Sequence, residues 1–237
     1  MDLVTDQLEA SGYAVIPDVV GNDEITNVGR FIDDGGNGVV GTRRLIIRPW
    51  CRELADWLTR DVRLSGSLPS DARPVQCTLF VKSTASNWLV SIHQDLSIPV
   101  ADRVDDPEYH GWSEKEGDLF VQPPVSVLDE MVAVRLHLDN CDESNGALRV
   151  VPGSHRFGRL TAAQAKQVRS AQGEVCVRVP RGGIMVMKPL LLHASSKALI
   201  NQRRRVLHFV FGPASLPGLL RWPTDANVLQ ESGLPWS

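Results

Sequence analysis

The sequence predicts a mainly β domain with flanking helices, in which the strands close into a barrel or pack as a sandwich. The first seventy residues have mostly helical patterns, whereas from Gln76 onward short strands alternate with turns. Many short strands preceded by helices are typical of a barrel or sandwich that helices buttress from outside. No repeat, low-complexity tract or long charge run divides the 237 residues, so we predict a single domain over residues 1–237.

The predicted helical buttress covers residues 1–70. A helix over residues 3–11 ends at Gly12, and a short strand follows over residues 13–16. Asn22 is a suitable N-cap for a helix over residues 23–33, whose first turn is acidic. Pro49 favours the first position of a third helix, which ends near residue 60.

The predicted barrel covers residues 74–212. In the strand over residues 76–82 the odd positions are apolar, while the even positions are Gln76, Thr78, Phe80 and Lys82. This mixed face lines a pocket in one interpretation and meets solvent in the other. Further strands are expected over residues 147–151, 174–179, 183–187 and 203–211, and Thr161 is expected to cap a short helix.

Residues 131–139 form the clearest strand of the sequence. Its even positions are all apolar, and Ala133, Arg135 and His137 lie on the opposite face. Two basic side chains on one face of a buried strand indicate either a cavity that binds an anion or a solvated outer face. With Lys82, they favour a small, anionic metabolite as the substrate.

Residues 100–127 are predicted to be an extended loop, because they are rich in proline and carry a polar run at residues 113–118. A long insertion of this kind in a compact domain is usually a lid or a binding loop. Trp112, Phe120 and Gln122 are therefore candidate substrate contacts. The alternative for each is that it packs the loop against the domain.

The composition excludes several classes of protein. The net charge of -3 and the pI near 6.1 argue against a general nucleic-acid binder. The four cysteines are widely spaced without a C-x-x-C pair, as in a reduced cytosolic protein. The acidic N-terminus does not resemble a signal peptide, and no apolar run reaches the length of a membrane span. We expect a cytoplasmic monomer or homodimer that acts on a small molecule, with no nucleic-acid or membrane partner.

The candidate site begins with His93 and Asp95. Residues i and i+2 of a strand project from the same face, so the two side chains can share one ion. An imidazole and a carboxylate are two thirds of the 2-His-1-carboxylate triad of non-haem iron. His193 ends a run of three leucines, where a buried imidazole needs a partner, and either a metal or core packing supplies one. Gln94 is a candidate substrate contact, and His208 fits a core histidine.

Four motifs follow one another in a specific order: Gly12–Pro17, His93–Asp95, Asn145–His155, and His193–Ser195 followed eleven residues later by Arg204. This order resembles the phytanoyl-CoA dioxygenase-like family of Fe(II)/2-oxoglutarate-dependent oxygenases, and the resemblance covers most of the chain. It implies a double-stranded β-helix, which is a jelly-roll or cupin-like barrel.

The resemblance also implies the roles of individual residues. His93, Asp95 and His193 are the catalytic metal ligands, and Arg204 binds the distal carboxylate of 2-oxoglutarate with help from Ser195. Alternation puts Arg204 on the opposite face from its two arginine neighbours, and Arg205 is the competing anchor if the register differs. The further candidates for cosubstrate binding are Gln76, Thr78 and Arg135. Arg135 stands where an aromatic residue is common, so it contacts either 2-oxoglutarate or the substrate.

The implied reaction oxidises an unactivated C–H bond with O2, while 2-oxoglutarate becomes succinate and CO2; ascorbate is a candidate activator in vitro. Halogenases of this superfamily have a small residue at the carboxylate position. Asp95 therefore favours hydroxylation, desaturation or ring formation. The alternatives are a cupin-like metalloenzyme or a metal-binding barrel that does not use 2-oxoglutarate.

Overall fold

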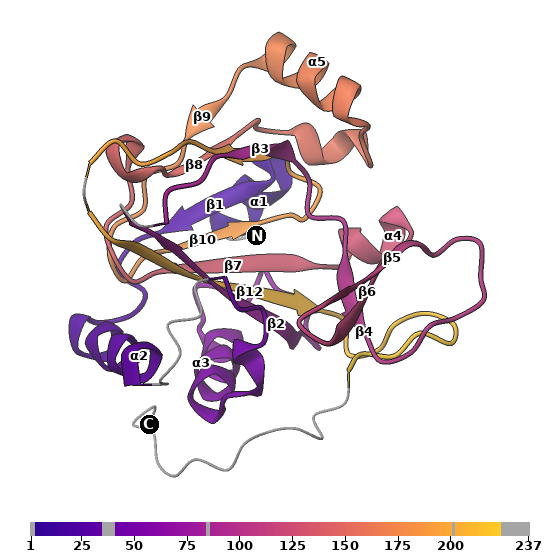
Figure 1. The fold of residues 1–237 in the computed structure, drawn as a ribbon, viewed down its shortest axis with the longest axis horizontal. Coiled ribbons are helices and arrows are strands. Elements are labelled where there is room, and N and C mark those ends of the chain that lie inside the picture. The colour runs from indigo at the N-terminus through magenta and orange to yellow at the C-terminus, as the bar shows by residue number, and fades with distance from the viewer. Residues whose placement is uncertain (1–2, 35–40, 84–85, 201, 224–237) are drawn as a thin grey trace.

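The computed structural model describes residues 3–34, 41–83, 86–200 and 202–223. Two antiparallel sheets face each other as the layers of a sandwich, with helices outside them (Figure 1). Among the described helices, none is both long and apolar enough to cross a membrane. Cys51, Cys77, Cys141 and Cys176 are all free thiols, as predicted.

The larger sheet has the strand order β1-β10-β7-β12-β2, and every pair in it is antiparallel. Its strands are β1 (Tyr13–Ile16), β2 (Arg73–Lys82), β7 (Val132–His137), β10 (Ile184–Met187) and β12 (Arg204–Gly212). The alternation predicted for β2 and β7 is confirmed. Their apolar faces point to the outer core, and their mixed faces point to the space between the sheets.

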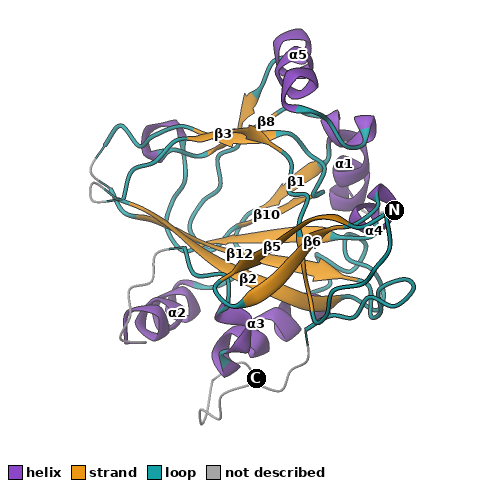
Figure 2. Ribbon diagram, turned by 45° about the vertical axis from the view of Figure 1, so that its right-hand side comes forward, coloured by secondary structure: helices purple, strands orange, loops and turns teal. Residues whose placement is uncertain are grey.

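The smaller sheet has the order β3-β11-β8-β9. Its strands are β3 (Val90–His93), β8 (Leu148–Val150), β9 (Val175–Cys176) and β11 (His193–Ser195). Figure 2 shows β3 and β8 in a layer above β12 and β2. Part of the space between the layers is filled by an apolar cluster that includes Leu148, Met185 and Leu191. The rest contains the polar side chains of the candidate site.

The N-terminal helices are α1 (Leu3–Ser11), α2 (Asn22–Asp34) and α3 (Pro49–Arg60), close to the predicted ranges. Both α2 and α3 cover the outer face of the larger sheet (Figure 1). Their buried side chains, such as Ile25 and Leu54, share one core with the apolar faces of β2, β7 and β12. This layer fixes the larger sheet from behind, so its inner face can carry functional side chains.

Gly12 joins α1 to β1 with a φ of +81°, a conformation that favours glycine. A Cβ atom there would lie 2.5 Å from His155 Nδ1 and 2.9 Å from Leu191 Cδ1. The glycine therefore permits the close approach of the chain to the loop before β11. The helix α5 (Ala162–Gln172) begins with a capping box in which Thr161 and Gln164 bond each other's backbone, as the Thr161 cap predicts.

The prediction of an extended loop over residues 100–127 is wrong. β4 (Ile98–Val100), β5 (His110–Lys115) and β6 (Asp118–Gln122) form a third antiparallel sheet, and α4 (Val125–Asp129) follows. The polar run at residues 113–118 is the tip of the β5–β6 hairpin, where Glu116 and Gly117 both have positive φ. Polar residues and prolines therefore mark the turns and ends of short strands here, instead of a loop without strands.

The tip of the β5–β6 hairpin is bonded to residues 42–44, which follow α2. Glu116 accepts hydrogen bonds from the Thr42 hydroxyl at 3.0 Å and from the Arg43 backbone and guanidinium at 3.0 and 3.1 Å. Arg44 forms an ion pair with Asp118 at 3.3 Å. These contacts bind the tip of the β5–β6 hairpin to residues 42–44.

Candidate metal centre and substrate cavities

The three predicted ligands converge between the sheets. His93 and His193 are register partners on the adjacent strands β3 and β11, and their rings are 4.2 Å apart. Asp95 follows β3, where its backbone N–H bonds to Pro189 O at 2.9 Å. Its carboxylate oxygens lie 3.8 Å from His93 Nε2 and 3.7 Å from His193 Nε2. One ligand atom from each residue lies within 4.8 Å of the others, which suits a shared metal ion.

Hydrogen bonds fix which imidazole nitrogens face the centre. His93 Nδ1 donates to Ser91 O at 2.8 Å, and His193 Nδ1 donates to Leu191 O at 2.9 Å. With the proton on Nδ1, the lone pair of Nε2 in each neutral tautomer points to Asp95. Metal-binding histidines usually donate their other ring N–H to a carbonyl or carboxylate in this way. The two Nε2 lone pairs and the Asp95 carboxylate face one another and repel, so a cation between them is favourable. Two imidazoles and one carboxylate are ligands that suit Fe(II).

The electrostatics keep Asp95 and His193 in their metal-binding forms. Burial raises the pKa of Asp95, but His193, His208 and His93 together lower it below its usual value. Burial is also the main reason that the pKa of His193 falls to about 4, although Asp95 opposes the shift. At neutral pH the centre therefore has an ionised carboxylate and a neutral His193.

His208 is a further buried group beside the centre, and it was predicted as a core histidine. Its Nε2 lies 3.9 Å from Asp95 Oδ2, and its Nδ1 accepts a hydrogen bond from the Arg135 guanidinium at 2.9 Å. Because arginine only donates, the neutral His208 ring carries its proton on Nε2, opposite to the tautomer of the two triad histidines. This tautomer presents an N–H to Asp95 and cannot bind a metal.

A small cavity of about 100 Å³ adjoins the triad. Its polar lining comes from both sheets: Lys82, His93, Asp95, Arg135, His193, Ser195, Arg204 and His208. Phe80, Trp88, Val90 and Leu148 complete it. Three cationic side chains therefore surround this space. Among the described residues that line it, Asp95 is the one acidic residue. Such a cavity attracts an anion.

Arg204 lies in this cavity, and Arg205 does not. The Arg204 guanidinium is buried and donates to Gly146 O, while its Nε has no partner among the described residues. Arg205 faces outward and binds the Asp139 carboxylate through Nε at 3.0 Å and NH2 at 2.9 Å. The alternation along β12 thus places only Arg204 near the triad, as the favoured register predicts.

The two other residues tied to the small cavity are Lys82 and Ser195. The Lys82 ammonium donates to the Ser195 hydroxyl and to Ser196 O, and Ser195 Oγ donates to Gly146 O at 3.0 Å. Burial, and then Arg204, lower the pKa of Lys82 to about 8. Lys82 thus lines the small cavity beside Ser195 and Arg204.

A larger cavity of about 370 Å³ lies on the other side of His93 and Asp95. Gln76 and Thr78, which were predicted beside the cosubstrate, line this cavity together with Phe80, Lys115 and Phe120. Leu128, Met131 and Ala133 add an apolar wall. The cavity therefore has room for a small organic substrate next to the triad.

Several predicted substrate contacts have other partners. Trp112 Nε1 donates to Tyr109 O at 3.2 Å, Gln122 packs against Gly111, and neither lines the two cavities. Gln94 reaches the larger cavity, but its amide bonds three backbone groups. His137 lines neither cavity and donates from Nδ1 to Arg135 O at 3.0 Å. The reason to expect an anionic substrate therefore does not rest on His137 or Lys82.

A 2-His-1-carboxylate site between the sheets of a jelly roll is typical of non-haem iron oxygenases. The family model "Phytanoyl-CoA dioxygenase (PhyH)" matches residues 8–206. The chain belongs to this family of Fe(II)/2-oxoglutarate-dependent oxygenases. The predicted family is thus confirmed. No curated protein matched the sequence.

Solved structures support the same fold. The chain is similar to HygX from Streptomyces hygroscopicus with nickel and 2-oxoglutarate bound, at 20% identity and a TM-score of 0.60 over 90% of this chain and 88% of that one. It is also similar to the non-heme alpha ketoglutarate dependent carbocyclase SnoK from nogalamycin biosynthesis, at 15% identity and a TM-score of 0.65 over 94% and 86%. EctD from S. alaskensis with 2-oxoglutarate and 5-hydroxyectoine gives 15% identity and 0.63 over 88% and 74%. The jelly-roll prediction is confirmed.

Proposed function

We propose that this protein is an Fe(II)/2-oxoglutarate-dependent dioxygenase that oxidises an unactivated C–H bond of a small metabolite. The observation that carries the proposal is the arrangement of His93, Asp95 and His193, whose metal-binding lone pairs converge between a small cationic cavity and a larger mixed one. A cosubstrate and a substrate need two such spaces on one metal centre. The cytoplasmic location and the monomeric or dimeric state stay predictions from the sequence.

His93, Asp95 and His193 hold the iron in this proposal, and 2-oxoglutarate occupies the small cavity. Arg204 binds the distal carboxylate, because its buried guanidinium has donors to spare and can form paired hydrogen bonds with a carboxylate. Arg135 binds the keto-acid end. It lies beside Asp95 and His208, its Nε is buried without a partner among the described residues, and it lines the small cavity instead of the larger one.

Lys82 and Ser195 support this site from one side. Their hydrogen bond joins β2 to β11, and Ser195 is anchored in turn to Gly146 O, the atom that also receives a bond from Arg204. Lys82 therefore positions the hydroxyl of Ser195 and adds positive charge behind the distal carboxylate. His208 orients Arg135 through Nδ1 and presents its Nε2–H to the oxygen of Asp95 that faces His193.

The prime substrate occupies the larger cavity. When bound, iron and 2-oxoglutarate activate O2 for C–H oxidation, with succinate and CO2 as coproducts. Leu128, Met131 and Ala133 exclude water from the substrate body. The residues that line both cavities, and so form the boundary between them, are Phe80, His93, Asp95 and His208. Gln76 donates to Thr78 Oγ1 at 2.9 Å through its amide nitrogen, and we assign its carbonyl oxygen to orienting a polar group of the substrate.

Hydroxylation is the proposed outcome. The carboxylate of Asp95 occupies the position where a halogenase needs space for a halide, and hydroxylation needs no further ligand. The structure of EctD contains 5-hydroxyectoine, while SnoK is described as a carbocyclase, so desaturation and ring formation are the finer alternatives.

Substrate-dependent release of succinate tests the proposal. Wild-type protein with Fe(II) and 2-oxoglutarate is incubated with a metabolite library, and succinate and oxidised products are measured by mass spectrometry. We expect succinate formation that depends on both a library compound and Arg204. A cupin-like enzyme that does not use 2-oxoglutarate would be indifferent to Arg204→Gln and would turn over its substrate without succinate.

A further inference from the structure

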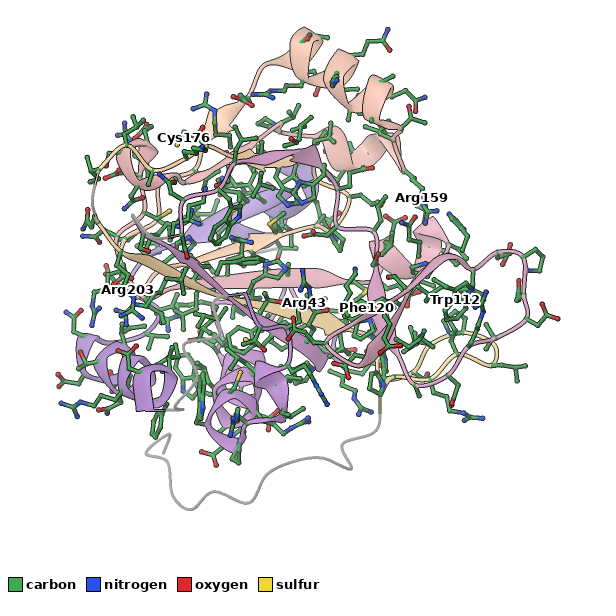
Figure 3. All side chains as sticks on the ribbon, in the orientation of Figure 1. Arg43, Trp112, Phe120, Arg159, Cys176 and Arg203 are labelled. Carbon is green, nitrogen blue, oxygen red and sulfur yellow. The ribbon has the colours of Figure 1, made fainter. Side chains whose placement is uncertain are left out.

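We propose that Lys115, together with Arg43, binds a carboxylate or phosphate group of the prime substrate at the mouth of the larger cavity. The inference rests on the proposed function, because it assigns the substrate class of that site. Both residues line the cavity that contains Asp95. Figure 3 shows Arg43 and Phe120 near each other.

Lys115 is a cation without a matching anion. Its Nζ lies 4.5 Å from the centre of the Phe120 ring, and among the described carboxylates none forms an ion pair with it. The neighbouring Glu116 turns away to bind Thr42 and Arg43. The aromatic ring supports the ammonium from one side, which leaves its remaining donors for a ligand in the cavity.

Arg43 adds a second positive charge at this edge. Burial lowers the pKa of Lys115, Arg43 lowers it further, and Asp95 raises it. Arg43 and Asp95 are therefore both close enough to act on the Lys115 charge. Arg43 is fixed in place because Glu116 accepts from its backbone and its guanidinium. Among the described residues that line the larger cavity, Asp95 is the acid, and it is committed to the metal centre. An anionic group at Lys115 is therefore attracted by an ammonium that no described carboxylate pairs with, while Arg43 shares its charge with Glu116.

The apolar lining of the larger cavity decides what the rest of the substrate is like. Ile98, Leu128, Met131 and Val210 line the larger cavity and present apolar side chains to it. A ligand with an anionic head at Lys115 would direct an uncharged body along this wall toward the triad. The chemical class is therefore a small amphipathic carboxylate or phosphate monoester whose oxidised carbon lies away from the charged group.

Calorimetric titration with matched probes tests this inference. The protein is loaded anaerobically with Fe(II) and 2-oxoglutarate, and hexanoate, hexyl phosphate, hexan-1-ol and hexylamine are titrated separately. We expect at least one anionic probe to bind about tenfold or more tightly than the alcohol and the amine, with an affinity that falls as salt is raised. The comparison of hexanoate with hexyl phosphate decides between the two head groups.

The variants assign the preference to one residue. Lys115→Met is expected to remove the anion preference, whereas Lys115→Arg keeps it. Lys166→Met, which removes a lysine from the exposed face of α5, is the charge-matched control and should leave the preference unchanged. Equal binding of the alcohol and both anions to wild type, or an anion preference that survives Lys115→Met, overturns the inference.

The same samples separate this inference from the proposed function. The visible charge-transfer band of the complex with Fe(II) and 2-oxoglutarate reports cosubstrate binding before any probe is added. A normal band in wild type and in Lys115→Met, with no anion preference in wild type, refutes the Lys115 assignment alone. The absence of the band in wild type refutes the cosubstrate assignment instead.

Discussion

Replacing Arg204 with glutamine removes the guanidinium that we assign to the distal carboxylate of 2-oxoglutarate. The side chain is only 3% exposed, so its hydrogen bonds to a ligand form away from water. Truncating one partner of a buried, charged pair costs roughly 2–5 kcal/mol. Lys82 and Arg135 still line the same cavity and retain part of the attraction. We therefore expect a loss of about 2–3 kcal/mol, or about 30- to 150-fold in the affinity for 2-oxoglutarate.

The assay is an anaerobic titration of the Fe(II)-loaded protein with 2-oxoglutarate, followed by the visible charge-transfer band. A second titration uses 2-oxobutyrate, which keeps the keto-acid end and lacks the distal carboxylate. If Arg204 contacts the distal carboxylate, the wild type should lose affinity when 2-oxobutyrate replaces 2-oxoglutarate, whereas Arg204→Gln should bind both compounds about equally.

Arg205→Gln is the matched control. It removes an identical charge from the next position of β12, but its guanidinium binds Asp139 on the outer face. We expect its affinity for 2-oxoglutarate to stay within about threefold of wild type, since a change outside the cavity removes no ligand contact. An equal loss in both variants, or a loss below threefold in Arg204→Gln, would refute the assignment.

Three further predictions follow from the same contacts. Burial is the main cause that lowers the pKa of His137 to about 3. His137 therefore binds a proton near pH 6.5 in the unfolded chain but stays neutral in the folded chain. The metal-free protein loses stability as pH falls below this value. His193 and His208 also have lowered pKa values and destabilise both proteins at low pH. In denaturant unfolding, wild type should therefore lose about 1.5–2 kcal/mol more than His137→Leu between pH 6.5 and pH 5. His208→Leu removes the N–H beside Asp95 and should weaken Fe(II) binding about tenfold in a chelator competition, while an unchanged affinity would contradict its positioning role. Glu116→Ala releases the β5–β6 hairpin from Arg43 and should speed amide exchange in residues 112–121; unchanged exchange there would argue against a lid.

Alternation along strands predicted much of the site. The inward face of β7 carries Ala133 and Arg135, and the inward face of β12 carries Arg204 and His208, as the period of two requires. His208 was nevertheless predicted as a core histidine, although it shares a face with Arg204. The same-face rule applied to both residues would have brought it into the site.

Other features depend on pairings that no local pattern encodes. His193 lies opposite His93 only because β11 pairs with β3 across about a hundred residues of chain, and the family motifs, not periodicity, identified it. Arg43 reaches the larger cavity through contacts of its loop with the tip of the β5–β6 hairpin. That hairpin was itself mistaken for a loop, because its strands are short, polar and flanked by proline.

The most direct test of the metal centre is anomalous X-ray diffraction at the iron edge from crystals grown anaerobically with Fe(II). A single peak is predicted at bonding distance from His93 Nε2, His193 Nε2 and one oxygen of Asp95, with both Nδ1 atoms still donating to Ser91 and Leu191. A peak at any other position, coordination through Nδ1 or through His208, or no peak despite full iron loading would contradict the assignment.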